Sequence, residues 1–444
     1  MPGATLPEDF LAATDAALSE TDTFLQRAYP GEDGRRQPVH TVYVPADRYT
    51  PGLPRQWGQA ALALIDEHGG MTALCGQLGL DPDLSAQVAE RVTAKLASDP
   101  IEDLRLDFED GYGDRGQQSE DADSVRAAAS LAEAVGAGTA PEFFGIRFKC
   151  FEAATRRRGI RTVDLFLAAL LERLGELPAG LVLTLPKVST VSQVEAMVAV
   201  CGALETAHQL PPGRLRFEVQ VETPQLILGA DGRAPVAAAI HAGDGRVTSL
   251  HYGTYDYSAS LQIAAEHQAA DHPAADHAKQ VMQLAAAGTG VHVADGSTNV
   301  LPVGAPDQVR SAWRLHFGLV RRALQRGFYQ GWDLHAGQLP TRYLATFAFY
   351  REGFPRAARR LADYVANTGS GVLDEPATVR ALARYLHRGY VCGAVEESEL
   401  VAGAGLDAGQ LAALARPHSD TETLRAGPDA RSSVATRHPS PGVH

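Results

Sequence analysis

The sequence is poor in cysteine and has no long apolar run. Its 444 residues include four widely spaced cysteines and no C-x-x-C pair: Cys75, Cys150, Cys201 and Cys392. This spacing argues against a zinc module or a disulfide framework and suits a reducing cytoplasm. No apolar run reaches the roughly 18 residues of a membrane-spanning helix, and the acidic, proline-broken N-terminus lacks a signal-peptide pattern. We therefore expect a cytoplasmic protein without a membrane partner.

Positive charge is also scarce. Lys and Arg total 40 against 53 Asp and Glu, which gives a net charge of −13. Because nucleic-acid binding needs a basic surface, we expect no nucleic-acid partner. The chain lacks G-x-x-x-x-G-K-[ST] and any strand-bound G-x-G-x-x-G, which disfavours nucleotide enzymes. It also lacks a G-x-S-x-G elbow, which disfavours a serine hydrolase.

Short apolar runs alternate with helical patterns along most of the chain. With a hydrophobic share of 45%, the chain can fill a large α/β core. About eight β-then-α units are predicted, the number that a closed parallel barrel needs. The predicted strands are 39–44, 104–108, 144–148, 181–188, 215–221, 247–252, 291–294 and 331–334. We predict an α/β protein, a (β/α)₈ TIM barrel with N-terminal helical additions and a C-terminal helical extension.

The predicted barrel domain covers residues 1–343. It includes an N-terminal helix at 8–27 and inserted helices within 50–98; the other predicted barrel helices are 122–135, 163–174, 191–207, 234–241, 275–287 and 308–326. Helices at 344–365, 376–388 and 407–416 predict a C-terminal helical segment over 344–416. The tail 417–444 is rich in Pro, Ser, Gly, Asp and Arg, so we expect it to be disordered.

Two predicted strand ends each present a carboxylate. The run FEVQVET places Glu222 at the end of one strand, and the strand 247–252 leads into the loop GTYDYS, which holds Asp256. In such barrels the chemistry lies on loops after the strands. A carboxylate pair suits Mg²⁺, which fills its shell with water and substrate oxygens, and a 2-oxo acid could chelate it. Two unrelated acidic residues would give the same pattern.

Other charged residues follow neighbouring strands. Arg147 could clamp a substrate carboxylate and steady an enolate, although a structural arginine is the alternative. Lys149 and Lys187 are weaker candidates of the same kind. Glu109 and Asp110 could orient metal-bound waters, or they could cap a helix.

Two polar stretches carry no predicted chemistry. The basic run TRRRGIRT, residues 155–162, could meet a phosphate, but we interpret it as a solvated loop. His267, His272 and His277 recur every five residues, which is not a helical metal-ligand spacing, and we interpret them as part of a polar surface loop.

The order of motifs resembles the HpcH/HpaI aldolase and citrate lyase β-subunit superfamily, which includes the malate synthases. The similar segments are TVYVPADRY, LDFEDGYGD, GIRFK, LTLPKV, VQVETP, HYGTYDYS, VADGSTN, GWDLHAGQLP and GSGVLDEPATVRAL. They span roughly residues 39–390, and their order on predicted strand ends is a stronger signal than any one motif. The resemblance implies a modified (β/α)₈ barrel that uses Mg²⁺ to make or break carbon–carbon bonds next to 2-oxo acids.

The resemblance also implies roles for the charged strand ends. Glu222 and Asp256 would bind Mg²⁺, with Mn²⁺ as an alternative. Arg147 would be the catalytic residue that binds the substrate and the enolate, and Asp110 an acid that supports the metal.

Three further positions follow from the same resemblance. Gly253, Thr254 and Lys187 would contact the substrate. Asp374 resembles an acid that the family places over a barrel mouth, often that of a neighbouring subunit. A catalytic acid or base at Asp374 would imply a homo-oligomer, with a trimer favoured.

The implied function is that of a Mg²⁺-dependent carbon–carbon lyase or aldolase acting on a small 2-oxo or 2-hydroxy acid. The chain departs from the family pattern by insertions at 50–98 and 229–246, by Tyr255 before Asp256, and by Ala-Gly after His335. These departures leave the substrate open. A malate-synthase-like condensation of an acyl-CoA with a glyoxylate-type acceptor is one alternative, a phosphoenolpyruvate-type reaction is another, and a non-catalytic barrel that binds a metabolite is a third.

Overall fold

The computed structural model describes residues 4–366 and 375–416. The chain forms two compact units, one of Met1–Gly79 with Val92–Ala345 and one of Leu80–Arg91 with Thr346–His444. Asp374 and the predicted tail at 417–444 lie outside the described residues. No helix of the described part is both long enough and apolar enough to cross a membrane.

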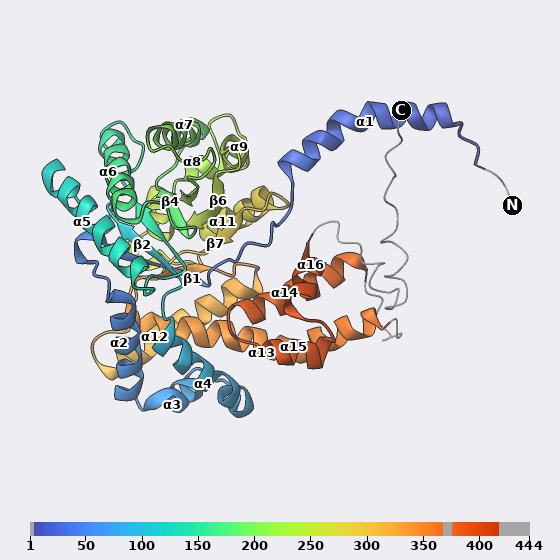
Figure 1. Ribbon diagram of the computed structural model, residues 1–444. Helices are drawn as coiled ribbons and strands as arrows, with labels where there is room; N and C mark the ends of the chain where they lie inside the picture. The colour runs from blue at the N-terminus through green and yellow to red at the C-terminus, as the bar shows by residue number, and fades with distance from the viewer. Residues whose placement is uncertain (1–3, 367–374, 417–444) are drawn as a thin grey trace. The chain divides into compact units, whose positions relative to one another are not determined.

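The first unit is built on one ring of eight parallel strands (Figure 1). In sheet order they are β7 (His292–Ala294), β6 (Val247–Tyr252), β5 (Phe217–Val221), β4 (Leu181–Leu185), β3 (Phe143–Arg147), β2 (Asp103–Asp107), β1 (His40–Pro45) and β8 (Gly331–Asp333). A single parallel bridge between Ala294 and Gln330 brings β7 to the start of β8, where the amide of Asp295 donates to the Gln330 carbonyl at 2.8 Å. The predicted (β/α)₈ barrel is confirmed.

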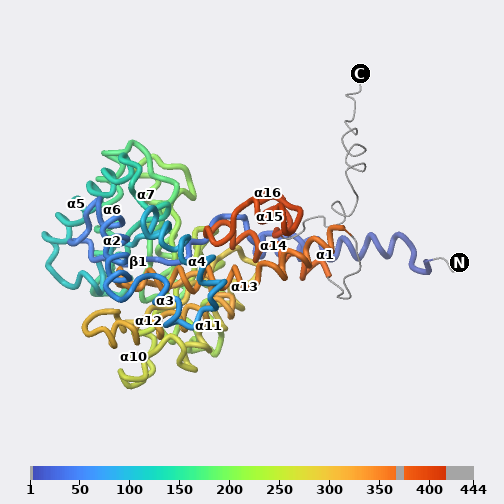
Figure 2. Tube along the Cα trace, turned by 90° about the horizontal axis from the view of Figure 1, so that it is seen from below, coloured from blue at the N-terminus to red at the C-terminus, as the bar shows by residue number. Residues whose placement is uncertain are grey.

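Helices follow the strands and cover the outside of the ring; α5 and α6 lie side by side there (Figures 1 and 2). The helices wholly within this unit are α1 (Glu8–Ala28), α2 (Leu53–Glu67), α3 (Gly70–Gln77), α5 (Gln117–Gly136), α6 (Arg156–Leu174), α7 (Val191–Ala207), α8 (Pro224–Ile227), α9 (Pro235–Ala242), α10 (Thr254–Ser260), α11 (Pro273–Ala286) and α12 (Pro306–Gln325). Helices α4 (Pro82–Ser98) and α13 (Leu339–Val365) each contribute to both units. The inserted helices expected within 50–98 are therefore α2, α3 and α4.

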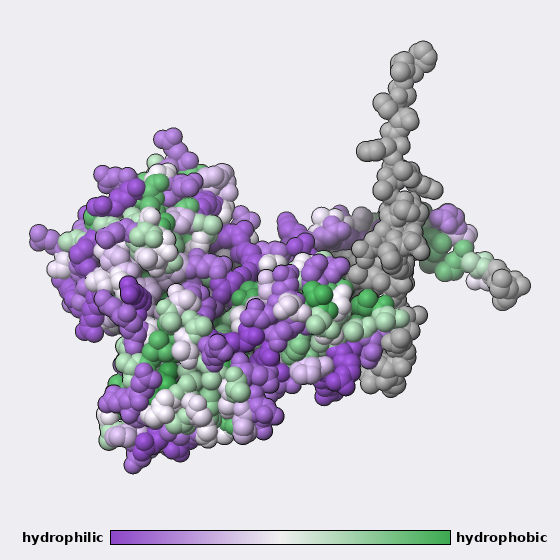
Figure 3. All heavy atoms as spheres, turned by 60° about the horizontal axis from the view of Figure 1, so that its bottom comes forward, coloured by the Kyte–Doolittle hydropathy of each residue, from purple (hydrophilic) through white to green (hydrophobic). Residues whose placement is uncertain are grey.

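Helix α1 has no buried residue in the described chain. Its exposed apolar side chains are Phe10, Leu11, Leu18, Phe24 and Leu25. Green atoms mark apolar surface on the part of this helix that Figure 3 leaves uncovered.

Three loop predictions were wrong. The basic run 155–162 forms the start of α6, because its arginines are good helix formers and its exposed face pairs with acids of α5, such as Arg161 with Asp121 at 2.9 Å. His272 caps α11, since its Nδ1 accepts from the Ala274 amide at 3.1 Å, and His277 lies within that helix. The GTYDYS segment is helical in α10, so Asp256 lies in the first turn of a short helix.

The second unit is helical. It holds α14 (Pro376–Val391), α15 (Glu397–Ala404), α16 (Ala408–Ala415) and parts of α4 and α13. Arg351 of α13 joins these helices through Glu399 at 2.7 Å and Gln87 at 2.8 Å. The helices predicted at 344–365, 376–388 and 407–416 are present, whereas the short α15 was not predicted.

The interior of the barrel is polar. Arg105 pairs with Glu218 at 2.9 Å, and the hydroxyl of Tyr43 lies 3.4 Å from the same glutamate. Tyr43 in turn accepts a hydrogen bond from Gln220 at 3.1 Å. The Oε1 atom of Gln220 lies 3.5 Å from Nη1 of Arg147. Side chains alternate along a strand, so the intervening apolar residues face the helices. This chain of contacts, called here the lumen network, runs along the barrel from Arg105 to Arg147.

Candidate active site

Charged residues converge at the carboxyl ends of five neighbouring strands. They are Glu109 and Asp110 after β2, Arg147 at the end of β3, Lys187 after β4, Glu222 after β5 and Asp256 after β6. Parallel strands in a barrel bring these ends to one mouth, where the active sites of such barrels lie. The sequence-based expectation that these residues lie near one another agrees with their contacts.

Lys187 joins four carboxylates. Its Nζ lies 2.8 Å from Asp110, 2.9 Å from Asp256 and 3.2 Å from Glu109. Its backbone amide donates to Glu222 Oε1 at 2.7 Å. The backbone there is left-handed, with a φ of +50°, a conformation that costs a non-glycine residue free energy. The turn after β4 thus aims both the amide and the ammonium of one residue at the acidic cluster.

Arg147 is held by Asp107, a residue that is not among the candidates predicted from the sequence. Its Nε and Nη2 each donate to the Asp107 carboxylate at 2.7 Å. Asp107 also accepts from the amides of Glu109 at 3.0 Å and Gly111 at 2.8 Å. One carboxylate therefore fixes both the arginine and the loop that carries Glu109 and Asp110. Among the described residues, the other end of the guanidinium, Nη1, has only two polar contacts, each of 3.5 Å, to Glu109 and Gln220.

The acidic cluster has unusual proton affinities. Burial raises the pKa of Glu222 to about 7, and Asp256 adds to the rise, while Lys187 and Arg147 oppose it. Burial raises the pKa of Glu109 to about 8, and its Oε2 makes no hydrogen bond within the described chain. Burial alone would lower the pKa of Lys187, but Glu222 and Glu109 hold it above its usual range. Negative charge is in excess at this mouth of the barrel.

Asp110 differs from its neighbour Glu109. Its side chain is 55% exposed. Burial works to raise the pKa of Asp110, but Arg147 and Lys187 outweigh it and hold that pKa below the usual value. Asp110 is therefore the ionised, solvent-facing member of the pair.

Gly253 is packed against the side chain of Glu222. A Cβ on Gly253 would lie 2.5 Å from Glu222 Cβ and 2.6 Å from its Oε2. Its neighbour Thr254 is buried, and its hydroxyl donates to the Ser297 carbonyl at 3.1 Å. In the structure both residues thus shape the wall behind Glu222; contact with a substrate stays a prediction.

A Gly253→Ala variant is expected to lose about 1–3 kcal/mol of unfolding free energy, because the added methyl overlaps the Glu222 carboxyl group. Chemical denaturation measures the change. The matched control is Gly318→Ala in α12, where a Cβ meets nothing within 4 Å and the exchange should be neutral or stabilising. Equal stability of the two variants would contradict the close packing.

The donor set suits a hard divalent cation. No group of three or more His, Cys, Asp or Glu side chains forms a preassembled metal cluster in residues 4–366 and 375–416. Mg²⁺, however, is commonly held by one or two carboxylates with water and substrate. Glu222 and Asp256 supply such a pair, the Lys187 ammonium already occupies a cation position between acids, and Glu109 Oε2, which has no hydrogen-bond partner in the described chain, is an oxygen left to accept from a metal-bound water. These residues fit the implied metal.

The chain was compared with known families and structures. A family model described as "Domain of unknown function (DUF6986)" matches residues 18–419, and a search of curated proteins found no match. A citrate lyase from Burkholderia xenovorans is 18% identical at a TM-score of 0.55, over 84% of this chain and 97% of that chain. A malate synthase from Haloferax volcanii in a magnesium/glyoxylate complex is 15% identical at a TM-score of 0.47, over 86% and 99%.

A third structure, a citrate lyase β subunit from Mycobacterium tuberculosis complexed with oxaloacetate and magnesium, is 18% identical at a TM-score of 0.40, over 71% of this chain and 99% of that chain. Of the three, the Burkholderia citrate lyase alone exceeds a TM-score of 0.5. It shows a shared fold, and the resemblance to the citrate lyase β-like barrels is confirmed at that level.

Proposed function

The chain belongs to the family that the matching model describes, and from that premise we propose that it is a Mg²⁺-dependent carbon–carbon lyase or aldolase acting on a small 2-oxo or 2-hydroxy acid. One observation carries the proposal: at one barrel mouth Lys187 contacts both Glu222 and Asp256, and Glu109 links Lys187 to Arg147. An acid pair next to a fixed guanidinium is what a substrate with adjacent keto and carboxylate oxygens requires.

Arg147 binds and orients the substrate. Asp107 takes its Nε and Nη2, which leaves Nη1, with its 3.5 Å contacts, to donate to a substrate oxygen. The guanidinium carbon lies 4.9 Å from the centre of the Tyr43 ring, so both the Asp107 carboxylate and the Tyr43 ring restrict the position of the arginine. A fixed cation next to a developing enolate needs no rearrangement as charge appears, which is how such groups lower barriers.

Glu222 and Asp256 would hold Mg²⁺, which when bound supplies a Lewis acid for the keto oxygen. Glu109 is the residue that we propose to hold the transferred proton, because it is buried at this mouth, its Oε2 has no hydrogen-bond partner in the described chain, and burial raises its pKa to about 8, near the working pH that acid–base catalysis needs. Asp374, the sequence-based candidate for this role, remains a proposal.

The test is a Mg²⁺ titration by calorimetry, followed by incubation with pyruvate, oxaloacetate or glyoxylate and product analysis. We expect Glu222→Gln and Asp256→Asn to weaken Mg²⁺ binding by about 100-fold or more, since each removes a charged ligand, and to abolish product formation. Glu266→Gln, on a side chain that is 79% exposed, is the matched control and should behave like wild type.

Three results would decide against parts of the proposal. Unchanged Mg²⁺ binding in Glu222→Gln would refute the metal site. Product that appears only when an acyl-CoA is added would identify a condensing enzyme. Binding of a 2-oxo acid with no product under any of these conditions would indicate a non-catalytic metabolite-binding barrel.

A further inference from the structure

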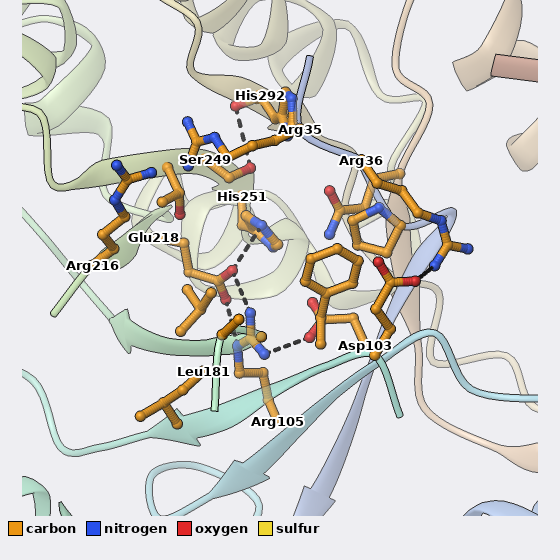
Figure 4. Close-up of a pocket in the computed structure, with 18 of the residues that line it drawn as sticks. Arg35, Arg36, Asp103, Arg105, Leu181, Arg216, Glu218, Ser249, His251 and His292 are labelled. Carbon is orange, nitrogen blue, oxygen red and sulfur yellow. Dashed lines mark hydrogen bonds and ion pairs between the residues drawn. The ribbon is translucent and has the colours of Figure 1, made fainter. Parts of the chain in front are cut away.

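A cavity lies at the mouth of the barrel opposite the acidic cluster, where the strands begin. It encloses about 680 Å³, within the range of small-molecule sites. Residues before β1 and at the starts of β2 to β8 line it, whereas the acidic cluster follows the strand ends. We call this cavity the basal pocket; Figure 4 shows it.

The wall of the basal pocket carries a guanidinium that has no direct ion-pair partner in the described chain. The side chain of Arg216 makes no hydrogen bond or ion pair in the described chain, and Figure 4 draws its head group near that of Arg35. Burial and the charge of Arg35 both hold the pKa of Arg216 below its usual value. Burial and the charge of Arg216 do the same to the pKa of Arg214, which donates to the carbonyls of Leu177 at 2.8 Å and Pro178 at 2.6 Å. Arg216 thus repels both Arg35 and Arg214 at one side of the cavity.

The remaining charges of the basal pocket are matched. Arg105 is paired with Asp103 at 2.5 Å and with Glu218 at 2.9 Å. Arg36 is paired with Glu102 at 2.8 Å. Arg35 contacts Asp33 at 2.5 Å, but that carboxylate is half exposed. The positive charge of Arg216 and Arg35 would therefore be stabilised by an anion bound beside them.

Apolar side chains also line the cavity. Phe143 and Leu181 stand at the starts of β3 and β4, and Val182 also lines the cavity. A free inorganic anion would leave this surface in contact with water. An occupant that carries an apolar portion would bury it, at about 25 cal/mol for each Å² removed from water.

We propose that the basal pocket is a second ligand site, which binds a small organic anion with its carboxylate or phosphate between Arg216 and Arg35 and its apolar portion against Phe143 and Leu181. The site is separate from the proposed metal centre and does not depend on the proposed reaction. A guanidinium binds either acid group through paired N–H donors, so both sources share one chemistry.

The experiment is calorimetric titration of the full chain, without added Mg²⁺ and at constant ionic strength. The probes are benzoate and phenyl phosphate, with benzylamine as the cationic probe of similar shape. We expect both anions to bind and benzylamine not to bind; the tighter of the two anions identifies the preferred acid group. Arg216→Gln should weaken anion binding at least about tenfold, the factor for losing 1.4 kcal/mol.

Two matched variants make the result specific. Arg216→Lys keeps the positive charge and should retain part of the affinity, whereas Arg233→Gln, whose side chain is 86% exposed, should bind as wild type does. Arg216→Gln relieves repulsion with Arg35, so its melting temperature without ligand should equal or exceed that of wild type. Anion binding that is unchanged in Arg216→Gln, binding of benzylamine equal to that of benzoate, or no binding of either anion would each overturn the proposal.

Discussion

An Arg147→Lys variant is expected to turn over its 2-oxo acid about 10² to 10³ times more slowly than wild type, the usual cost of removing one donor aimed at developing charge. Lysine keeps the charge but is a single ammonium. It cannot occupy both Asp107 oxygens, as Nε and Nη2 of Arg147 do at 2.7 Å, and also present a third nitrogen to the substrate. The measurement is kcat at saturating Mg²⁺ on the substrate that the product screen identifies.

The control for this variant is Arg310→Lys, at an arginine that pairs with a 92% exposed aspartate on α12. It should leave kcat unchanged. Circular dichroism and Mg²⁺ titration of Arg147→Lys separate a lost catalytic contact from a damaged fold or metal site. A kcat of Arg147→Lys within about threefold of wild type, a difference under 1 kcal/mol, would show that the guanidinium has no catalytic role.

An Asp333→Asn variant is expected to lose about 3–5 kcal/mol of unfolding free energy, the usual effect of removing one member of a buried ionic cluster. Asp333 is fully buried at the end of β8. It contacts His40 at 2.7 Å, Arg342 at 2.9 Å and His316 at 3.0 Å. Asparagine keeps the shape but removes the charge that these three groups share. Chemical denaturation at pH 7 measures the loss.

The comparison variant is Asp307→Asn, which removes an ion pair between an exposed aspartate and Arg310. Such a surface pair is worth at most about 1 kcal/mol. Similar losses in the two variants would mean that the buried cluster is not a stabilising unit.

The contribution of Asp333 should depend on pH in a definite direction. Burial alone would raise the pKa of Asp333, but Arg342 and His316 outweigh it and hold that pKa well below its usual value. A lowered folded-state pKa gives stability that is present above the unfolded-state pKa of about 3.9 and is lost as the pH falls through the folded value. The stability difference between wild type and Asp333→Asn should therefore be largest near neutral pH and shrink in strong acid.

The spacing of strands and helices was enough to predict the barrel, because each apolar run and each turn signal is local. The sequence was also enough to place Glu222 at a strand end. In its strand, FEVQVE, polar and apolar residues alternate, so Glu222 lies on the same face as Glu218 and Gln220. Asp107 obeys the same alternation in LRLDF, in phase with Arg105, and could have been found from it. It was overlooked because its role is to hold Arg147, a contact between strands that no local pattern records.

Other features of the site had no sequence signal. The left-handed backbone of Lys187 is imposed by the fold, since lysine has no preference for it. The raised pKa of Glu109 arises from burial next to residues far away in the chain. Arg214 stands before the predicted strand 215–221 and Arg216 within it, both as ordinary polar residues, and only closure of the barrel brings Arg35 next to Arg216.

The lumen network has a consequence for any attempt to redesign this protein. Glu218 reaches the basal pocket and Arg147 reaches the acidic cluster, yet both are joined through Tyr43 and Gln220. Residues that share hydrogen-bonding partners do not contribute additively to free energy. The effects of substitutions at the two mouths should therefore be coupled, so a library that varies one mouth while the other is held fixed would sample only part of the sequences that this barrel can accept.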